Sequence, residues 1–277
     1  MLSGNIEYYK PTTLNEAVEL FFALKEKNKI PLYYAGGTEI LTLGRFDIFK
    51  TKALIDIKGI EECHSFEFID DWLIAGAALP LTFIEEKNLF PLLSEASKGI
   101  ADHTTRNKIT LGGNLCGTIF YREAVLPFLL CDSKVIVVAN DRVAAVPIAE
   151  IFQHTFQLKE GQFLIQLLTE KRYINLPFIS IKKYQQWETG YPLITVASIK
   201  VANEIRFAFS GLCPFPFRSK ELETAINQSG LPLDSRIKQA LEHLPKPILD
   251  DVEGSKEYRL FVLKNTLRNI ILKMEGK

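Results

Sequence analysis

Ala35-Gly36-Gly37-Thr38-Glu39-Ile40 places two adjacent glycines directly after an apolar run at residues 30–34. The run is typical of a short buried strand. Glycine at its end tolerates a positive φ and lets another group come close to the backbone. Successive N–H groups in such a turn can converge on an anion, and the Thr38 hydroxyl adds a donor. The stretch therefore indicates an anion-binding turn at the end of a strand.

A second stretch of the same kind, Thr110-Leu111-Gly112-Gly113-Asn114-Leu115, follows about one small domain later. The working hypothesis is that both loops close on one diphosphate from opposite sides. The alternative for either loop is a turn that merely reverses the chain. The sequence holds neither G-x-G-x-x-G after a strand nor G-x-x-x-x-G-K-[ST], so Rossmann and P-loop sites are not supported.

Composition narrows the class of protein. The 277 residues carry 33 basic and 33 acidic side chains, so no net field would steer nucleic acid or an anionic membrane. The four cysteines form no C-x-x-C pair, which leaves zinc and iron–sulfur ligation without support and is typical of reduced thiols. No serine or cysteine lies in a nucleophile elbow. We therefore expect a cytoplasmic protein without covalent hydrolase chemistry and without a metal site of its own.

Local patterns place helices and strands around the two loops. Capping boxes at residues 13–16 and 82–85 predict helix starts, and the first helix should end near Lys27. An uninterrupted β-branched run predicts a strand at residues 134–139, and Asp70-Asp71 predicts a hairpin turn. Further strands are predicted at residues 31–34, 53–57, 163–168, 178–182, 195–201 and 205–210, and further helices at 91–101, 219–228, 235–244 and 256–273.

The order of these elements predicts an α+β protein, because strands precede helices in the C-terminal part. We expect three parts, at residues 1–58, 59–170 and 171–277. Asp250-Asp251 is interpreted as a solvated turn. For Arg106-Asn107, simple surface polarity and a functional role both stay open.

Several motifs together resemble the FAD-binding subunit of molybdenum hydroxylases, of the xanthine dehydrogenase and carbon monoxide dehydrogenase type. Residues 106–115 are similar to the family's RN-x-x-T-[IL]-GGNL signature, and the loop at residues 35–41 precedes it at the right separation. Gly211 with Pro216 and Arg218, and Gly254-Ser255-Lys256-Glu257-Tyr258-Arg259, extend the resemblance over nearly the whole chain. It implies a vanillyl-alcohol-oxidase (PCMH) type FAD-binding fold, with two N-terminal α/β lobes and a C-terminal α+β lobe.

The resemblance implies FAD as cofactor and a set of residues that would hold it. The two glycine loops would bind the diphosphate, Ile100 would pack near the flavin, and Glu123 would bind the adenosine part. Leu164 and Lys183 fall near positions that touch the adenine and the isoalloxazine ring. The complete implied set is Leu32, Ala35, Gly36, Gly37, Thr38, Glu39, Ile40, Ile100, Thr110, Gly113, Asn114, Glu123, Leu164 and Lys183.

The sequence also departs from the family pattern. Glu39 and Glu123 stand where relatives often have aspartate, and residues 116–122 replace a stretch of small residues and a proline. The family implies a molybdopterin-binding large subunit and a [2Fe-2S] small subunit as partners, with NAD as the electron acceptor. Two alternatives stay open: an assembly or scaffold protein with a degenerate flavin site, and a stand-alone flavin oxidase.

Overall fold

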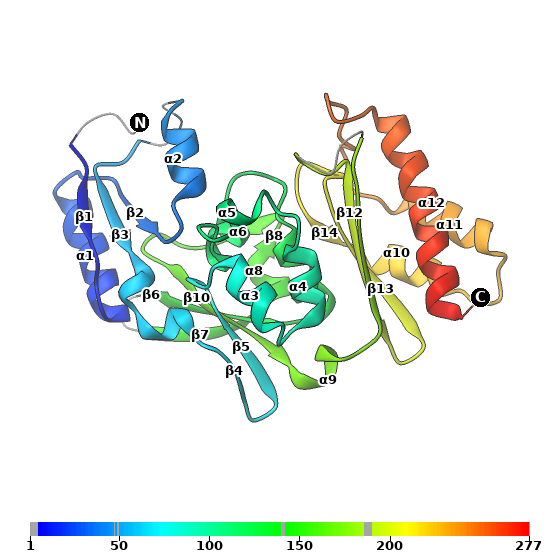
Figure 1. Ribbon diagram of the computed structural model, residues 1–277, viewed down its shortest axis with the longest axis horizontal. Coiled ribbons are helices and arrows are strands. Elements are labelled where there is room, and N and C mark those ends of the chain that lie inside the picture. Colours follow the sequence, from blue (N-terminus) through cyan, green and yellow to red (C-terminus); the bar gives the residue numbers. More distant parts are fainter. Residues whose placement is uncertain (1–4, 47, 49, 140–141, 186–189, 277) are drawn as a thin grey trace.

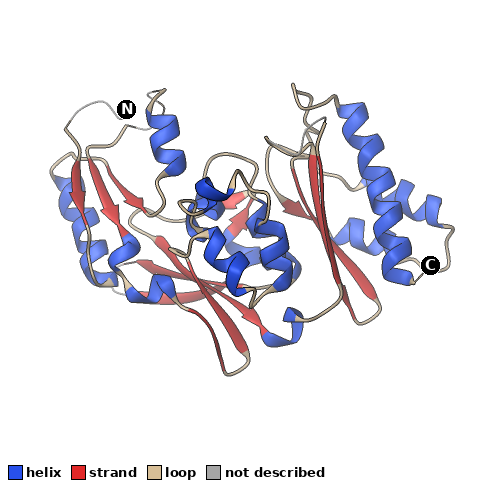
Figure 2. Cartoon of the chain, viewed as in Figure 1, coloured by secondary structure: helices blue, strands red, loops and turns tan. Residues whose placement is uncertain are grey.

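A computed structural model describes residues 5–46, 48, 50–139, 142–185 and 190–276 of the chain. Three main sheets follow one another along the molecule, with helices packed between and outside them (Figure 1, Figure 2). The fold is α+β, as the order of predicted elements indicated. Within the described residues, no helix is both long enough and apolar enough to cross a membrane.

The first sheet is small and parallel, and it carries the first glycine loop. Its strands, in spatial order, are β1 (Glu7–Tyr9), β3 (Ala53–Asp56) and β2 (Pro31–Tyr34). Helix α1 (Leu14–Glu26) contacts β2 and β3. The loop follows β2 and leads into α2 (Thr38–Gly44). A parallel sheet of this kind brings the carboxyl ends of its strands to one edge, which is where the loop lies.

The second sheet is antiparallel, and the second glycine loop lies among the helices associated with it. Its strands, in spatial order, are β4 (Phe66–Ile69), β5 (Trp72–Gly76), β10 (Phe163–Glu170), β6 (Lys134–Ala139) and β7 (Arg142–Pro147). The α-helices of this part are α3 (Leu81–Lys87), α4 (Pro91–Ser97), α5 (His103–Arg106), α6 (Leu111–Cys116), α7 (Leu126–Leu130) and α8 (Ile148–Ile151). Short connections are η1 (Ile57–Gly59), η2 (Glu61–His64), η3 (Glu123–Val125), and the paired β8 (Phe152–Gln153) and β9 (Thr155–Phe156).

The third sheet is antiparallel and has helices on both faces (Figure 1). Its strands, in spatial order, are β11 (Phe178–Lys183), β12 (Ile194–Val201), β13 (Glu204–Ser210) and β14 (Phe217–Arg218). Helix α9 (Lys171–Ile174) leads into it, and α10 (Lys220–Ile226), α11 (Leu233–Glu242) and α12 (Lys256–Glu275) follow. Ala197 belongs to the core shared with the second sheet, whereas Val196 belongs to the core under the C-terminal helices. Neighbouring residues of a strand thus bury opposite faces.

Two arginines join the third sheet to the helices of the second. Arg206 and Arg218 donate to the carbonyl oxygens of Leu130 and Leu129, at 2.7 and 2.8 Å. Both also pair with the carboxylate of Asp132, each at 2.8 Å. Cations near the last carbonyls of a helix are favourable, because these oxygens lack a partner within the helix. The end of α7 is therefore bound to β13 and β14.

One of the two predicted capping boxes is wrong. The hydroxyl of Thr13 accepts a hydrogen bond from the Glu16 N–H at 3.2 Å, so this residue caps α1 as predicted. Helix α3 instead begins after Pro80, without a side-chain cap. The Thr82 hydroxyl donates to Asn107 Oδ1 at 2.7 Å, because the start of α3 packs against the segment that precedes the second glycine loop.

Two other expectations need correction. The helix predicted for residues 91–101 ends at Ser97, because Gly99 and Ala101 both have positive φ, +78° and +53°. Strand β7 was not predicted. It is an edge strand whose side chains are mostly exposed, so its sequence lacks the apolar alternation of a half-buried strand.

Candidate functional site

A cavity of about 840 Å³ lies where the parts of the chain around the three sheets meet. Its walls come from residues within 32–42 of the first part, within 99–123 and 158–164 of the second, and 190–192 of the third. Both glycine loops contribute to the lining. The cavity is thus large enough, and close enough to the loops, to be the candidate site.

The two glycine loops touch each other directly. A Cβ atom added at Gly36 would lie only 1.8 Å from the carbonyl oxygen of Lys108 and 3.2 Å from the Thr110 nitrogen. Only glycine permits this approach, since no side chain can occupy the space. Loops more than 70 residues apart in the sequence therefore form one wall of the cavity.

The first loop has unused backbone donors. Within the described residues, the N–H groups of Gly36, Gly37 and Thr38 have no hydrogen-bond acceptor. Gly37 has a φ of +73° and ends the loop at the start of α2. Backbone N–H groups that line a cavity without a partner are available to an anionic ligand.

The backbone donors of the second loop are already bonded within the protein. The Gly112 N–H donates to the Ala77 carbonyl at 2.8 Å, and the Gly113 N–H donates to the Thr110 hydroxyl at 3.2 Å. The Asn114 N–H donates to the Thr110 carbonyl at 2.9 Å. What this loop offers the cavity is therefore mainly side chains, which the symmetric two-loop hypothesis did not anticipate.

Two buried polar atoms on cavity-lining residues have no partner. Among the residues that the structure describes, nothing forms a hydrogen bond with Oδ1 of Asn114 or Nε of Arg122. An unpaired buried polar atom is costly, because it has lost its water without gaining a hydrogen bond. Both atoms therefore indicate that this part of the protein is arranged for a polar ligand.

Glu39 lines the cavity, but its carboxylate is occupied by the protein. Oε1 accepts hydrogen bonds from the N–H and the hydroxyl of Thr118 at 2.6 and 2.8 Å, and Oε2 accepts from the Ile119 N–H at 3.3 Å. A Cβ at Gly117 would lie 2.5 Å from Oε2. Glu39 therefore joins α2 to the segment after α6, and its carboxylate oxygens are bonded within the protein.

The ion pair between Lys58 and Asp56 holds the first loop through a backbone carbonyl. Lys58 Nζ donates to the Ala35 carbonyl at 2.6 Å and to both oxygens of the buried Asp56 at 2.8 Å. Its ammonium also lies 4.5 Å from the ring centre of Tyr34. The hydrogen bond from Tyr8 to Asp56 raises the pKa of the Tyr8 phenol to about 12. The loop is therefore held in place without using its own N–H groups.

Arg106 is structural rather than part of a polar surface. Its side chain is buried, pairs with Glu85 at 3.1 Å and donates to the Ala101 carbonyl at 2.9 Å. These bonds fix the left-handed segment that presents Ile100 to the cavity. The interpretation of Arg106 as an ordinary polar surface residue is therefore wrong.

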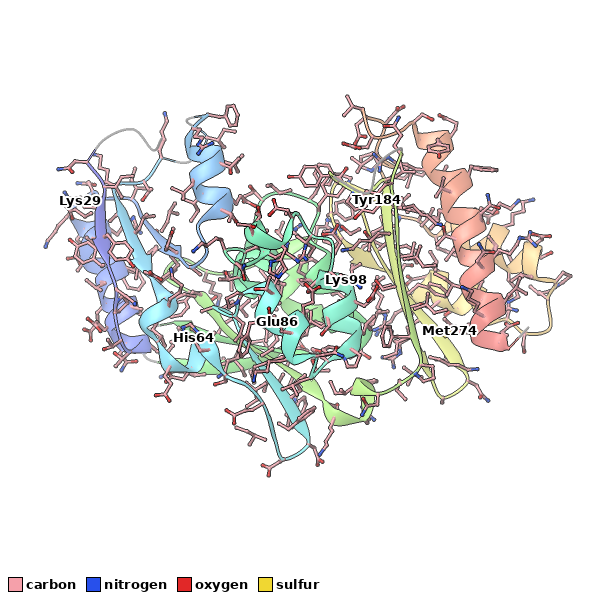
Figure 3. The ribbon with its side chains drawn as sticks, viewed as in Figure 1. Lys29, His64, Glu86, Lys98, Tyr184 and Met274 are labelled. Atoms are coloured by element: carbon pink, nitrogen blue, oxygen red, sulfur yellow. The ribbon has the colours of Figure 1, made fainter. Side chains whose placement is uncertain are left out.

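Neither of the two neighbouring lysines on β11 lines the cavity, and of the two it is Lys182 that reaches the second part of the chain. Lys183 is exposed and does not line the cavity, because successive side chains of a strand point to opposite faces. Lys182 donates to the carbonyl of Lys98, which lies between the helices of the second part and the third sheet (Figure 3). Burial lowers the pKa of Lys182, and the nearby Glu123 opposes that effect.

Glu123 is buried and lines the cavity. Burial raises the pKa of its carboxyl, while the ammonium of Lys182 acts in the opposite direction. Together with this residue, the structure brings nearly the whole predicted set to the cavity. The lining residues from that set are Leu32, Ala35, Gly36, Gly37, Thr38, Glu39, Ile40, Ile100, Thr110, Gly113, Asn114, Glu123 and Leu164.

Tyr121 and Tyr191 were missed by the sequence reasoning. Their rings stack with centres 4.3 Å apart and an angle of 12°, and both line the cavity. Arg259, which is fully buried, donates to the carbonyls of Leu193 and Gly211 and so fixes the chain next to Tyr191. The motif at residues 254–259 was the only signal for this arrangement.

The turn at residues 250–251 also needs correction. Asp251 pairs with Arg259 at 2.5 Å, so it is not simply a solvated turn residue.

Comparison with known proteins agrees with this site. Residues 4–168, more than half of the chain, match the family described as the FAD binding domain in molybdopterin dehydrogenase. The chain is 24% identical over 285 residues to a xanthine dehydrogenase FAD-binding subunit of Escherichia coli O157:H7, covering 95% of this chain and 94% of that protein. It is 25% identical over 233 residues to the carbon monoxide dehydrogenase medium chain of Hydrogenophaga pseudoflava, covering 79% and 78%.

Solved structures show the same fold. A chain of the carbon monoxide dehydrogenase from Hydrogenophaga pseudoflava that lacks the Mo-pyranopterin moiety superposes with a TM-score of 0.85 at 20% identity, covering 97% of this chain and 96% of that one. A chain of quinoline 2-oxidoreductase from Pseudomonas putida 86 gives 0.84 at 19% identity, covering 99% and 98%. The fold is the PCMH-type FAD-binding fold. The chain therefore belongs to the FAD-binding domain family of the molybdopterin dehydrogenases, and its cofactor is FAD.

Proposed function

We propose that this chain is the electron-transferring subunit of a xanthine dehydrogenase-like complex. Its partners in this proposal are a molybdopterin-binding large subunit and a [2Fe-2S] small subunit, and NAD is the electron acceptor. Support comes from the relatives, which are named as subunits or chains of xanthine, caffeine and carbon monoxide dehydrogenases. Purine specificity belongs to the same proposal, and its support is that xanthine and caffeine, named in two of these relatives, are both purines.

The observation that carries the proposal is the combination of free donors and an unpaired acceptor on one cavity. The N–H groups of Gly36, Gly37 and Thr38 have no described acceptor, and Asn114 Oδ1 has no described donor. All four residues line the cavity of about 840 Å³. A dinucleotide with a diphosphate and several hydroxyl groups offers partners for both kinds of atom, so the residues present fit FAD.

Each part of the cavity has a role in this proposal. The first loop binds the diphosphate through its backbone N–H groups, and Thr110, Gly113 and Asn114 border it from the other side. Ile100 packs near the flavin, while Glu123 and Leu164 lie toward the adenosine part. In this proposal the chain has three parts. Residues 1–58 and 59–170 surround the cofactor, and residues 171–277 cover the isoalloxazine ring of the flavin.

The redox chemistry is that of bound FAD, which can take up electrons singly and pass them on as a pair. The chain's own residues bind and orient the cofactor and limit its contact with water. The stacked rings of Tyr121 and Tyr191 contribute an apolar part of the wall. The hydrogen bonds of Arg259 hold that wall against the third sheet.

The test starts with the purified full-length chain. About one FAD per chain is expected, either as isolated or after incubation with FAD, measured from the flavin absorbance and the protein concentration. A second measurement follows reoxidation of the dithionite-reduced protein by NAD. A protein that binds FAD but is not reoxidised by NAD would overturn the choice of acceptor. A folded chain that never takes up flavin would overturn the cofactor role in this protein.

A scaffold or assembly protein with a degenerate flavin site is the second candidate. The observation in its favour is that the Gly112 and Gly113 N–H groups are already satisfied within the protein. This candidate predicts assembly with the partner subunits but no stoichiometric FAD. The flavin content of the purified complex therefore separates the two functions.

A further inference from the structure

The peptide group between Ala35 and Gly36 has its two polar atoms in different surroundings. The Ala35 carbonyl accepts a hydrogen bond from Lys58 Nζ at 2.6 Å. The N–H of the same peptide group, that of Gly36, has no acceptor among the described residues. The group is trans and planar, so its C=O and N–H point in opposite directions. The bond that fixes the carbonyl therefore also fixes the Gly36 N–H, which is directed away from Lys58.

Lys58 reaches this carbonyl from outside the cavity. Ala35 and Gly36 line the cavity, whereas neither Lys58 nor Asp56 does. Lys58 lies in η1, directly after β3, and β3 is the parallel neighbour of the strand that leads into the loop. Parallel neighbours end at the same edge of a sheet, so the lysine that follows β3 meets the loop that follows β2. A ligand in the cavity and the ammonium of Lys58 therefore approach the peptide group from different sides.

The ammonium of Lys58 is held in a defined position. Nζ donates to both carboxylate oxygens of Asp56 at 2.8 Å and lies 4.5 Å from the centre of the Tyr34 ring, a favourable arrangement for a cation. The Asp56 side chain, only 2% exposed, also accepts from the Tyr8 hydroxyl and from the Lys58 N–H. The lysine is thus ordered by the protein itself, and a ligand that uses the loop does not have to order it.

The charges of the ion pair also affect what the loop can bind. A buried carboxylate beside the loop would repel an anionic ligand, and the ammonium of Lys58 compensates the charge of Asp56. A cation bonded to a carbonyl polarises the peptide group and makes the N–H at its other end a stronger donor. Lys58 therefore favours an anion at the Gly36 N–H without contacting that anion.

We infer that Lys58 is a positioning residue for the diphosphate of FAD. It holds the Ala35 carbonyl so that the Gly36 N–H donates to a phosphate oxygen, and it compensates the charge of Asp56 beside the loop. The inference rests on the proposed FAD-binding function and adds to it a residue that does not line the cavity.

The first test measures affinity with the full-length chain. Lys58→Met keeps an unbranched side chain but removes the ammonium, and Lys58→Arg keeps a cation. Dissociation constants are measured by calorimetry for FAD and for ADP, a probe that has the diphosphate but no flavin. We expect Lys58→Met to weaken binding of both ligands about tenfold, the effect of one lost hydrogen bond, and Lys58→Arg to restore most of the affinity. Unchanged dissociation constants for Lys58→Met would overturn the inference.

A double variant covers the case in which Lys58→Met does not fold. Asp56→Asn combined with Lys58→Met removes the carboxylate that the single variant leaves buried without its partner. The Ala35 carbonyl still lacks its donor in this protein, so we expect FAD and ADP to bind about tenfold more weakly than to the wild type. Wild-type affinity of the double variant would overturn the positioning role.

Lys29→Met is the matched control. Lys29 pairs with Glu7 at 2.5 Å, and its side chain is 34% exposed, against 35% for Lys58. It does not line the cavity and lies at the outer edge of the first part (Figure 3). Lys29→Met should bind FAD and ADP like the wild type. An equal loss of affinity in both methionine variants would make the effect a general one of breaking an ion pair and would overturn the inference.

A spectroscopic measurement observes the Gly36 N–H itself. The sequence contains two Ala-Gly pairs, Ala35-Gly36 and Ala75-Gly76. With ¹³C in the alanine carbonyls and ¹⁵N in the glycines, a spectrum that correlates each N–H with the preceding carbonyl shows these two pairs alone. The Gly76 N–H already donates to the Ser65 carbonyl at 2.8 Å, so its signal is the internal reference.

Saturation with ADP should shift the Gly36 signal of the wild type much more than the reference signal. In Lys58→Met the shift at saturation should be clearly smaller, because the N–H is no longer held toward the phosphate. A lysine with a merely structural role would change the melting temperature but leave this shift as large as in the wild type, and that result would overturn the inference.

The outcomes distinguish this inference from the function on which it rests. A wild-type chain that binds no FAD overturns the proposed function. A wild type that binds FAD and ADP, but whose Gly36 signal does not respond to ADP, overturns the assignment of Lys58 alone.

Discussion

Glu39 and Thr118 are joined by two hydrogen bonds although they lie 79 positions apart. The Glu39 carboxylate accepts from the Thr118 N–H at 2.6 Å and from its hydroxyl at 2.8 Å. The first residue belongs to the helix after the first glycine loop, and the second lies just beyond the second loop. The two loops are thus connected by side-chain bonds as well as by the contact between Gly36 and Lys108.

Replacing Glu39 tests this connection. Glu39→Ala leaves the Thr118 and Ile119 donors without their acceptor, so we expect a loss of about 1 kcal/mol in unfolding free energy, since the bonds are partly exposed to water. The release of FAD should become faster, because the two walls of the cavity are no longer joined. Urea denaturation and stopped-flow fluorescence measure the two effects.

Glu39→Gln and Glu150→Ala serve as comparisons for that experiment. The glutamine keeps one oxygen acceptor and should retain part of the stability. Glu150 is an exposed helix residue outside the cavity, so its replacement should leave the FAD release rate unchanged. Equal release rates for Glu39→Ala and Glu150→Ala would contradict a connecting role for Glu39.

Gly37→Val is expected to abolish FAD binding. Gly37 has a φ of +73°, which is unfavourable for a β-branched residue, and an added Cβ would lie 2.3 Å from Cε2 of Tyr34. The structure thus changes the physical reason for this prediction: the first clash is with a tyrosine ring that also lines the cavity. Flavin content after reconstitution measures the effect, and circular dichroism checks that the variant is folded.

Two further variants separate backbone strain from the clash. Gly37→Asn tolerates the left-handed conformation but carries the same Cβ, so it should still lose most of its flavin. Gly230→Val is the control, because a Cβ at Gly230 meets nothing within 4 Å and its φ is not positive. Normal flavin content in a folded Gly37→Val variant would exclude this loop as the diphosphate site.

The stability of the apoprotein should depend on pH through Glu123. Burial raises the pKa of this carboxyl above its ordinary value of 4.5, so the folded chain keeps the proton to a higher pH than the unfolded chain. Stability falls with rising pH wherever the folded state holds more protons. The wild type should therefore lose stability relative to Glu123→Gln as the pH rises above about 4.5, until the folded carboxyl has ionised.

Urea denaturation of both proteins over a series of pH values measures this difference. Because the Lys182 ammonium near Glu123 is present in both proteins, the comparison isolates the titration of the carboxyl. A difference in unfolding free energy that stays constant with pH, or that changes in favour of the wild type as the pH rises, would contradict the prediction.

Features that depend on local chemistry could be predicted from the sequence. The strand before the first loop, the helix capped by Thr13 and the long C-terminal helix follow from periodicity, capping and turn residues. The motif order also identified the family and its cofactor, because glycines and their flanking residues recur at fixed separations. The strand and the helices need only a residue and its near neighbours, whereas the family follows from the order and spacing of motifs along the chain.

Properties that depend on which distant segments meet could not be predicted. Lys182 rather than Lys183 reaches the Lys98 carbonyl, because strand pairing sets which face each side chain takes. Glu39 bonds to Thr118 instead of remaining free for a ligand. The edge strand β7 has mostly exposed side chains and so leaves no pattern of its own.

The glycine pair at residues 36–37 has some properties that the sequence alone determines and others that only the folded structure determines. Its freedom to adopt a positive φ and to expose N–H groups belongs to the residue type, and the sequence alone was enough to indicate an anion-binding turn. That Gly36 packs on the Lys108 carbonyl, and that Arg122 is buried, depends on long-range packing. Burial and the loss of water determine whether a polar atom is satisfied or costly, and these arise only when the chain is folded.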